Sequence, residues 1–153
     1  MRKLLIGFVL ASVATLALPG AANAARPPKL NLAISNFRFC KAAPCSPFDF
    51  GYLRTNSGPV SGSDNPNAVI SVKRGTTVVW KYADSTCNAI SGCTGHNIWF
   101  ENGGVGVKKG AVPSNSSKTI TVKITQKPGI TIRYFCTVNG HYMFGMTGIL
   151  HVT

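Results

Sequence analysis

Several short stretches of this chain carry apolar residues at every second position. Successive side chains of a β-strand point to opposite faces of a sheet, so this period of two predicts strands with one buried face. Between the apolar positions stand mostly threonine, lysine and arginine, which suit the solvent-facing side. The apolar series are Val78, Trp80 and Tyr82; Ile120, Val122 and Ile124; and Ile130, Ile132, Tyr134 and Cys136.

Turn-forming residues separate these stretches, and we find no convincing helix among them. Glycine, proline and asparagine gather at 73–75, 102–104, 112–115 and 127–129. Many short strands between such turns indicate an all-β antiparallel sandwich or barrel. We find no internal repeat and no second domain.

Residues 41–67 have a different composition, rich in proline, glycine, serine and asparagine. This composition predicts a long surface loop inserted after the first strand. Phe48, Phe50 and Tyr52 nevertheless alternate within it, so we expect part of the insertion to lie against the sandwich as a short strand.

The N-terminal residues have the features of a secretory signal peptide. Arg2 and Lys3 precede an apolar run from Leu4 to Leu18, and Ala22 to Ala24 form a small-residue cleavage site. The run is too short to span a membrane. We therefore expect residues 1–24 to be removed, leaving a single domain over 25–153 that has no transmembrane segment and resides in a bacterial periplasm.

The chain is strongly basic, with 16 lysines and arginines against 4 aspartates and glutamates and a formal net charge of +12. Such a field can steer an acidic partner or favour an anionic surface, and it equally fits an exported protein with a basic surface and no further role. No motif indicates specific nucleic-acid binding. We expect a monomer.

Five cysteines in an exported chain suggest two disulfides and one thiol with another purpose. Cys136 is the natural thiol, which leaves Cys40, Cys45, Cys87 and Cys93 for the disulfides. Three pairings of these four are possible, and the sequence does not choose among them.

The C-terminal segment places Cys136, His141 and Met146 at two equal steps of five residues. Soft thiolate and thioether donors combined with an imidazole suit copper, and with a second histidine they form an electron-transfer site. His96 is the candidate, because it is in phase with Ile98 and Phe100 and so faces the same core as Cys136. His151 alternates with apolar neighbours and is expected to face solvent. Met143 is a rival axial residue, two positions after His141.

These segments resemble the cupredoxins, the small blue copper proteins that include plastocyanin, azurin and the phytocyanins. The resemblance covers nearly all of the expected mature chain. The spacing from Cys136 through His141 to Met146 resembles that of phytocyanins more than that of plastocyanin, while the 41–67 insertion and the cysteine pairs depart from the family. Four segments of this chain carry the resemblance: 32–39 as the first strand, 70–80 as the pair of strands before the first ligand, 95–100 around His96, and 134–152 with the turn Gly145-Met146-Thr147-Gly148.

The resemblance implies a Greek-key β-sandwich holding one copper ion that alternates between Cu(I) and Cu(II). It implies that Asn97 steadies the ligand loop and directs a backbone N–H toward the Cys136 sulfur. It also implies an apolar docking patch around His141 formed by Gly140, Tyr142, Met143 and Phe144. The expected partners are redox proteins, among them acidic cytochromes or membrane-bound oxidoreductases.

Three other functions are open at the level of sequence. Cys93, His96, Cys136 and His141 have the composition of a tetrahedral structural zinc site. A copper carrier or buffer without electron transfer would use similar ligands, although it often has more methionines than this chain. An enzyme is the weakest alternative, because four protein ligands leave no open coordination position and the chain has too few histidines for a second copper.

Overall fold

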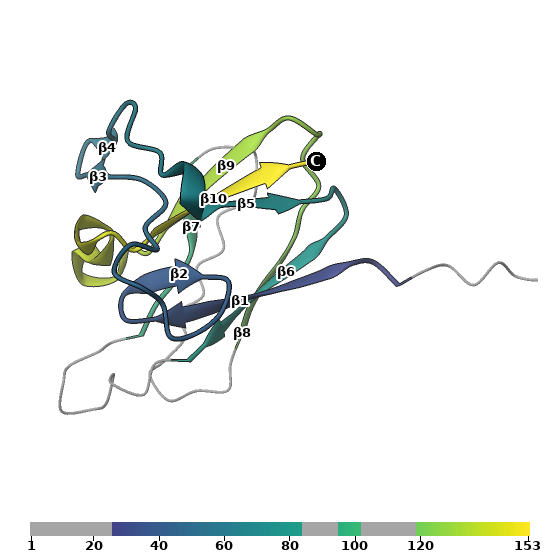
Figure 1. The fold of residues 1–153 in the computed structure, drawn as a ribbon, viewed down its shortest axis with the longest axis horizontal. Helices are drawn as coiled ribbons and strands as arrows, with labels where there is room; N and C mark the ends of the chain where they lie inside the picture. The colour runs from purple at the N-terminus through teal and green to yellow at the C-terminus, as the bar shows by residue number, and fades with distance from the viewer. Residues whose placement is uncertain (1–25, 84–94, 102–118) are drawn as a thin grey trace, which may run out of the picture.

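The computed structural model describes residues 26–83, 95–101 and 119–153. The expected signal peptide, Cys87, Cys93 and the turns at 102–104 and 112–115 lie outside the described residues. Within them the chain forms two four-stranded sheets and one small two-stranded sheet (Figure 1).

The first sheet has the order β2-β1-β6-β8, and its strands are β1 (Lys29–Ser35), β2 (Arg38–Cys40), β6 (Thr77–Tyr82) and β8 (Thr119–Lys123). The second has the order β5-β10-β9-β7, with β5 (Val69–Val72), β7 (Trp99–Phe100), β9 (Thr131–Phe135) and β10 (Thr147–Val152). Each sheet contains one parallel pair, β1 with β6 and β5 with β10, and its other pairs are antiparallel. The predicted all-β sandwich is therefore confirmed, but the expectation of a purely antiparallel arrangement is wrong.

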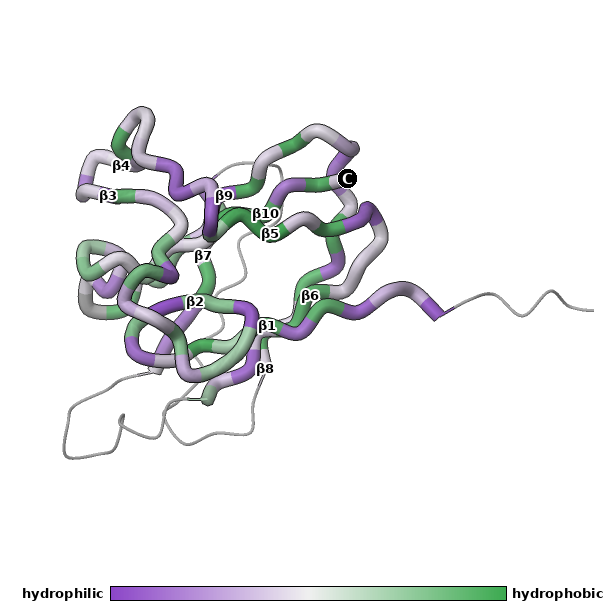
Figure 2. The backbone as a smooth tube through the Cα atoms, in the orientation of Figure 1, coloured by the Kyte–Doolittle hydropathy of each residue, from purple (hydrophilic) through white to green (hydrophobic). Residues whose placement is uncertain are grey.

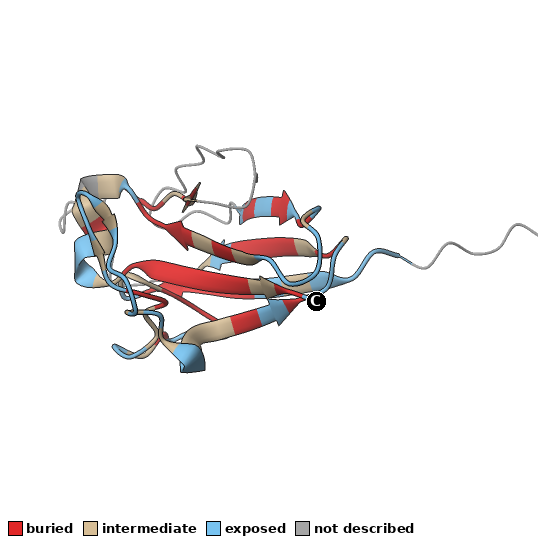
Figure 3. Ribbon diagram, turned by 90° about the horizontal axis from the view of Figure 1, so that it is seen from above, coloured by how far each residue is buried: buried red, intermediate tan, exposed pale blue. Residues whose placement is uncertain are grey.

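The core lies between the two sheets, where the buried residues of facing strands meet (Figures 2 and 3). Trp80 and Tyr134 pack edge to face at its centre, with ring centroids 5.3 Å apart. Strict alternation of buried and exposed residues is present only in β8, because Val79 of β6 and Phe135 of β9 are buried although they lie on the faces opposite to the core residues. The residues predicted to face inward are buried or half-buried, with one exception. Ile130 is 39% exposed, because β9 begins only at Thr131 and Ile130 still belongs to the preceding turn.

The segment expected as one strand over 32–39 is divided in two. Asn36 and Phe37 both have positive φ, 50° and 55°, and so form a tight turn between β1 and β2. Phenylalanine is unusual in this backbone conformation, and the apolar alternation on either side does not reveal it. The insertion consequently follows the second strand rather than the first.

The insertion packs against the end of the sandwich that carries residues 138–144, opposite the C-terminus (Figure 1). Its only strands in the described chain, β3 (Arg54–Thr55) and β4 (Gly58–Pro59), pair with each other. The expected strand at Phe48, Phe50 and Tyr52 does not form. Tyr52 is fully buried, however, and its backbone N–H donates to the hydroxyl of Thr147 at 3.0 Å.

A disulfide between Cys40 and Cys45 closes the start of the insertion, with the two Cα atoms 5.6 Å apart. Two 3₁₀ helices complete the described chain, η1 (Pro66–Ala68) and η2 (Val138–Phe144). The second occupies the expected ligand loop. Among the described residues there is no helix of sufficient length and apolarity to span a membrane.

Candidate metal centre

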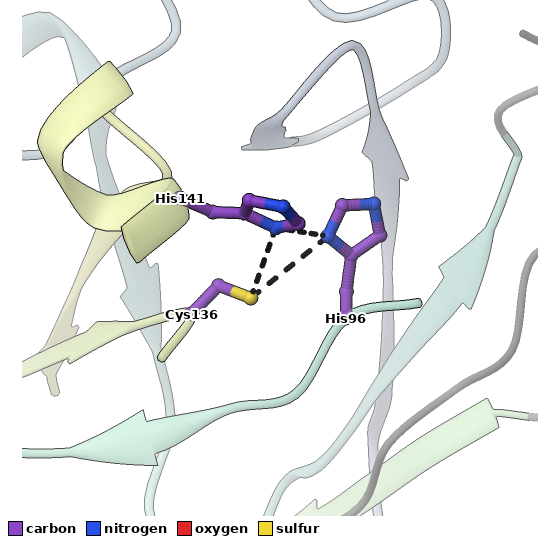
Figure 4. Close-up of side chains that lie close together, drawn as sticks. All are labelled: His96, Cys136 and His141. Atoms are coloured by element: carbon purple, nitrogen blue, oxygen red, sulfur yellow. Dashed lines mark hydrogen bonds between the residues drawn. The ribbon is translucent and has the colours of Figure 1, made fainter. Parts of the chain in front are cut away.

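His96, Cys136 and His141 converge at one end of the sandwich (Figure 4). The Nδ1 atoms of the two histidines are 3.1 Å apart, and the Cys136 sulfur lies 3.8 Å from His96 Nδ1 and 3.6 Å from His141 Nδ1. All three residues are buried. Three residues that the sequence separates by up to 45 positions therefore present one donor atom each to a common point.

Each ligand candidate comes from a different element. Cys136 follows directly on β9, His141 lies in η2, and His96 precedes β7. Gly145 ends η2 in the left-handed conformation, φ 88°, which favours glycine. The turn returns the chain so that Cys136 N–H donates to Met146 O and Met146 N–H donates to His141 O, both at 3.1 Å.

The three-donor cluster has the size that a metal requires. Donors that lie about 2.0–2.3 Å from one metal ion are roughly 3.3–3.8 Å from each other. The observed separations are close to this range, and two imidazoles with a thiolate are the equatorial donors of a blue copper site. The other cluster of possible ligands among the described residues is Cys40, Cys45 and Asp49, but the sulfurs of the two cysteines are already joined in the disulfide.

Burial sets the protonation of the metal-free cluster. It raises the pKa of the Cys136 thiol, and hydrogen bonds from the backbone N–H groups of Asn97 and Val138 oppose this increase in part. Burial also lowers the pKa of His141, which keeps the imidazole neutral and ready to donate its lone pair. A metal that binds here displaces the thiol proton, since only the thiolate is a strong ligand.

Asn97 links the His96 segment to the ligand loop. Its side chain accepts a hydrogen bond from Thr137 N–H at 2.8 Å and donates one to Thr137 Oγ1 at 2.7 Å. Its backbone N–H points to the Cys136 sulfur. These are the two kinds of contact that the resemblance assigns to this position.

Aromatic rings enclose the histidines. Phe37, in the tight β1–β2 turn, packs edge to face on His141 with centroids 4.8 Å apart and on His96 at 5.9 Å. Tyr82 stacks on His96 at 5.4 Å. Apolar alternation predicts that Tyr82 lies in the core, but it gives no sign of the position of Phe37, because that position depends on a backbone turn.

The remaining sequence-predicted site residues have different surroundings. Met146 is fully buried in the core, and His151 lies on β10, outside the three-residue cluster. Met143 and Phe144 are 57% and 66% exposed, while Gly140 is half-buried. Tyr142 is half-buried, and its hydroxyl donates to Asn56 of the insertion.

The C-terminal half of the chain, residues 65–153, matches the family described as copper binding proteins, plastocyanin/azurin family. The chain belongs to this family. The matched region contains His96, Cys136, His141 and Met146, and it excludes β1, β2 and nearly all of the insertion. No curated protein matches the chain.

Several solved structures match the chain at low sequence identity and with TM-scores below 0.5. An oxidized plastocyanin from Dryopteris crassirhizoma is 18% identical, covering 80% of this chain and 99% of its own, with a TM-score of 0.43. A reduced auracyanin from Roseiflexus castenholzii is 17% identical over 82% and 96%, with a TM-score of 0.46. A purple cupredoxin from Nitrosopumilus maritimus is 18% identical over 66% and 94%, with a TM-score of 0.36.

Family membership settles which metal the cluster suits. The spacing of the donor atoms alone fits zinc or copper, but this family binds copper, and the donors are soft enough for it. The predicted cupredoxin fold and a single copper cofactor are thereby confirmed. The zinc interpretation requires Cys93, which lies outside the described residues.

Proposed function

We propose that this cupredoxin is an exported electron carrier with one type 1 copper site, in which His96, Cys136, His141 and Met146 would hold the metal. The observation that carries the proposal is the buried three-donor cluster in a chain of the copper-binding family. Copper bound there would accept or release one electron by alternating between Cu(I) and Cu(II).

The protein's own residues keep this site rigid and dry. Two backbone hydrogen bonds, from Cys136 N–H to Met146 O and from Met146 N–H to His141 O, hold the three loop residues in one closed turn. Asn97 fixes that turn to the segment that carries His96. A site whose donors are held in place changes little with metal charge, which favours rapid electron transfer.

His141 is the proposed point of electron exit. Met143 and Phe144, two and three positions after it, are both exposed, so they supply an apolar surface beside the site. A small transient interface of this kind suits a carrier that must release its partner. We propose redox proteins as partners, with acidic cytochromes or membrane-bound oxidoreductases as the classes that fit the basic charge, and the periplasm as the location.

Burial of the ligands also bears on the two alternative functions. A copper carrier must transfer its metal to a partner, and all three clustered donors here are buried. An oxidase needs an open coordination position, and in the proposed site Met146 would supply a fourth protein donor. We therefore propose that the protein turns over no substrate. If the copper protein does not oxidise small phenols at steady state, this supports the proposal.

The deciding experiment is visible absorption and EPR of the Cu(II)-loaded protein, compared with Cys136→Ser. We expect an intense thiolate-to-copper absorption band with narrow copper hyperfine splitting, lost in Cys136→Ser, and reversible one-electron voltammetry. His141→Gln, which removes a proposed ligand, should change the spectrum. His151→Gln is its matched control, because it removes a histidine outside the cluster and should leave the spectrum unchanged. A colourless protein, or a spectrum independent of Cys136, would overturn the proposal.

A further inference from the structure

The insertion places one arginine against all three segments that carry the clustered donors. The guanidinium carbon of Arg54 lies 3.8 Å from the ring centroid of Phe135 and 4.6 Å from that of Tyr142. Phe135 immediately precedes Cys136, and Tyr142 immediately follows His141. The two rings also contact each other edge to face, with centroids 5.5 Å apart.

The third contact of Arg54 leads to the His96 segment. Its Nε donates to Glu101 Oε1 at 2.5 Å, and Glu101 follows β7, five residues after His96. Both side chains are largely buried, with 15% and 11% of their surface exposed. An ion pair at this depth is costly to break, because either charge left alone would be buried without its partner.

The insertion itself is fastened on both sides of Arg54. Gly51 N–H and Tyr52 N–H donate to Thr147 Oγ1 at 3.1 and 3.0 Å, directly after Met146. Asn56 accepts the hydroxyl hydrogen of Tyr142. Arg54 therefore extends from a loop that is fixed to the copper end before and after it.

We propose that Arg54 is a positioning residue of the copper site, which sets the relative placement of the Cys136, His141 and His96 segments without touching the metal. This inference rests on the proposed function and assigns a role to the insertion. Arginine suits the role because a planar guanidinium can stack on aromatic rings and pair with a carboxylate at once, whereas a lysine ammonium keeps only the charge.

The test uses the full-length copper-loaded protein with the double variant Arg54→Met plus Glu101→Gln. This change removes both charges together, so that no unpaired buried carboxylate confuses the result, and methionine retains an apolar cover over Phe135. We expect copper affinity to fall about 10–100-fold, as for other residues that orient metal ligands, with altered EPR hyperfine splitting and a shifted reduction potential. Arg54→Lys, which keeps the ion pair, should recover part of each effect.

Arg74→Ala is the matched control, since it removes an exposed arginine from the turn between β5 and β6 and should leave all three readouts unchanged. A double variant with the affinity, spectrum and potential of the wild type would overturn the inference, even if it melts at a lower temperature. If the double variant does not fold, Arg54→Lys is compared with the wild type instead. An Arg54→Lys protein with wild-type affinity, spectrum and potential would then overturn the inference. A wild type that lacks the Cys136-dependent spectrum contradicts the proposed function instead, which separates the two failures.

Discussion

At the scale of single residues, the environment of Cys136 depends on Asn97. The thiol is buried, which raises its pKa, and two backbone N–H groups direct partial positive charge toward the sulfur. The Asn97 side chain meanwhile makes two hydrogen bonds to Thr137, the residue after Cys136. One residue thus orients both the sulfur and the start of η2.

Asn97→Ala should weaken this link without removing a ligand. We expect the free energy of unfolding of the metal-free protein to fall by about 1–3 kcal/mol, because Thr137 loses both of its bonds to the side chain. Copper should also dissociate faster. Urea denaturation and transfer of copper to a chelator measure the two effects, and Thr137→Val is the companion variant that removes one of the same bonds.

If Asn97→Ala has wild-type stability and copper dissociation rate, the two hydrogen bonds do not hold the loop. A change in stability alone would show that Asn97 supports the fold and leaves the metal site unaffected.

The ligand candidates could be predicted from sequence because their chemistry is rare and their spacing is regular. A free cysteine, a histidine and a methionine at equal steps leave few alternatives, and strand phase selects His96. Phe37 and Arg54 could not be found in this way. The position of Phe37 depends on a positive-φ turn, and Arg54 is a charged residue in a polar segment, which normally indicates exposure.

At the scale of elements, the path from β9 through η2 to β10 requires two glycines. Gly145 ends η2 with positive φ, and its N–H donates to the carbonyl groups of His141 and Tyr142. Gly148 lies in β10 opposite Tyr134 of β9, where a Cβ atom would be 2.2 Å from the Tyr134 ring. The buried tyrosine therefore uses the space that a side chain at 148 would need.

Gly148→Ala should destabilise the fold by about 1–3 kcal/mol, the cost of an overfilled core, because Tyr134 cannot move far between the two sheets. Thermal denaturation of the single variant measures this cost. Repeating the substitution in a Tyr134→Leu background should reduce it, since the smaller side chain vacates the space. Equal costs in the two backgrounds would contradict the overlap with Tyr134.

Alternating apolar residues identified the strands that form most of the sandwich, because one face of each is buried against the other sheet. The same pattern failed where tertiary contacts decide the conformation. Tyr52 is buried through its bond to Thr147 rather than through strand pairing, and η2 forms in a segment without helical periodicity. Both the Tyr52 segment and η2 lie at the end of the sandwich that carries the metal centre.

At the scale of the whole molecule, charge is unevenly distributed. Each carboxylate side chain of the described residues faces an arginine: Asp49 with Arg38, Asp64 with Arg133, and Glu101 with Arg54. The other basic residues of the described chain are all exposed, and they give the protein a positive field. They are Arg26, Lys29, Lys41, Lys73, Arg74, Lys81, Lys123 and Lys127.

This field should control the rate at which the reduced copper protein meets charged electron acceptors. Raising the ionic strength from about 0.01 M to about 1 M shortens the screening length from about 30 Å to about 3 Å. Oxidation by an anionic acceptor, hexacyanoferrate(III), should then slow about tenfold or more, because attraction no longer raises the encounter rate. Oxidation by a cationic cobalt(III) phenanthroline complex should accelerate. Stopped-flow absorption at the thiolate-to-copper band follows both reactions.

One double variant locates the part of the field that matters. Lys73 and Arg74 lie in the turn between β5 and β6, at the end of the sandwich away from η2, so reversing both to glutamate changes the net charge far from His141. If the whole field steers the acceptor, this variant should show a weaker salt dependence; if only charges beside η2 matter, its rates should match the wild type. Rates of the wild type that are the same at every ionic strength would contradict electrostatic steering and leave the exposed Met143 and Phe144 as the features that guide a partner to the copper end.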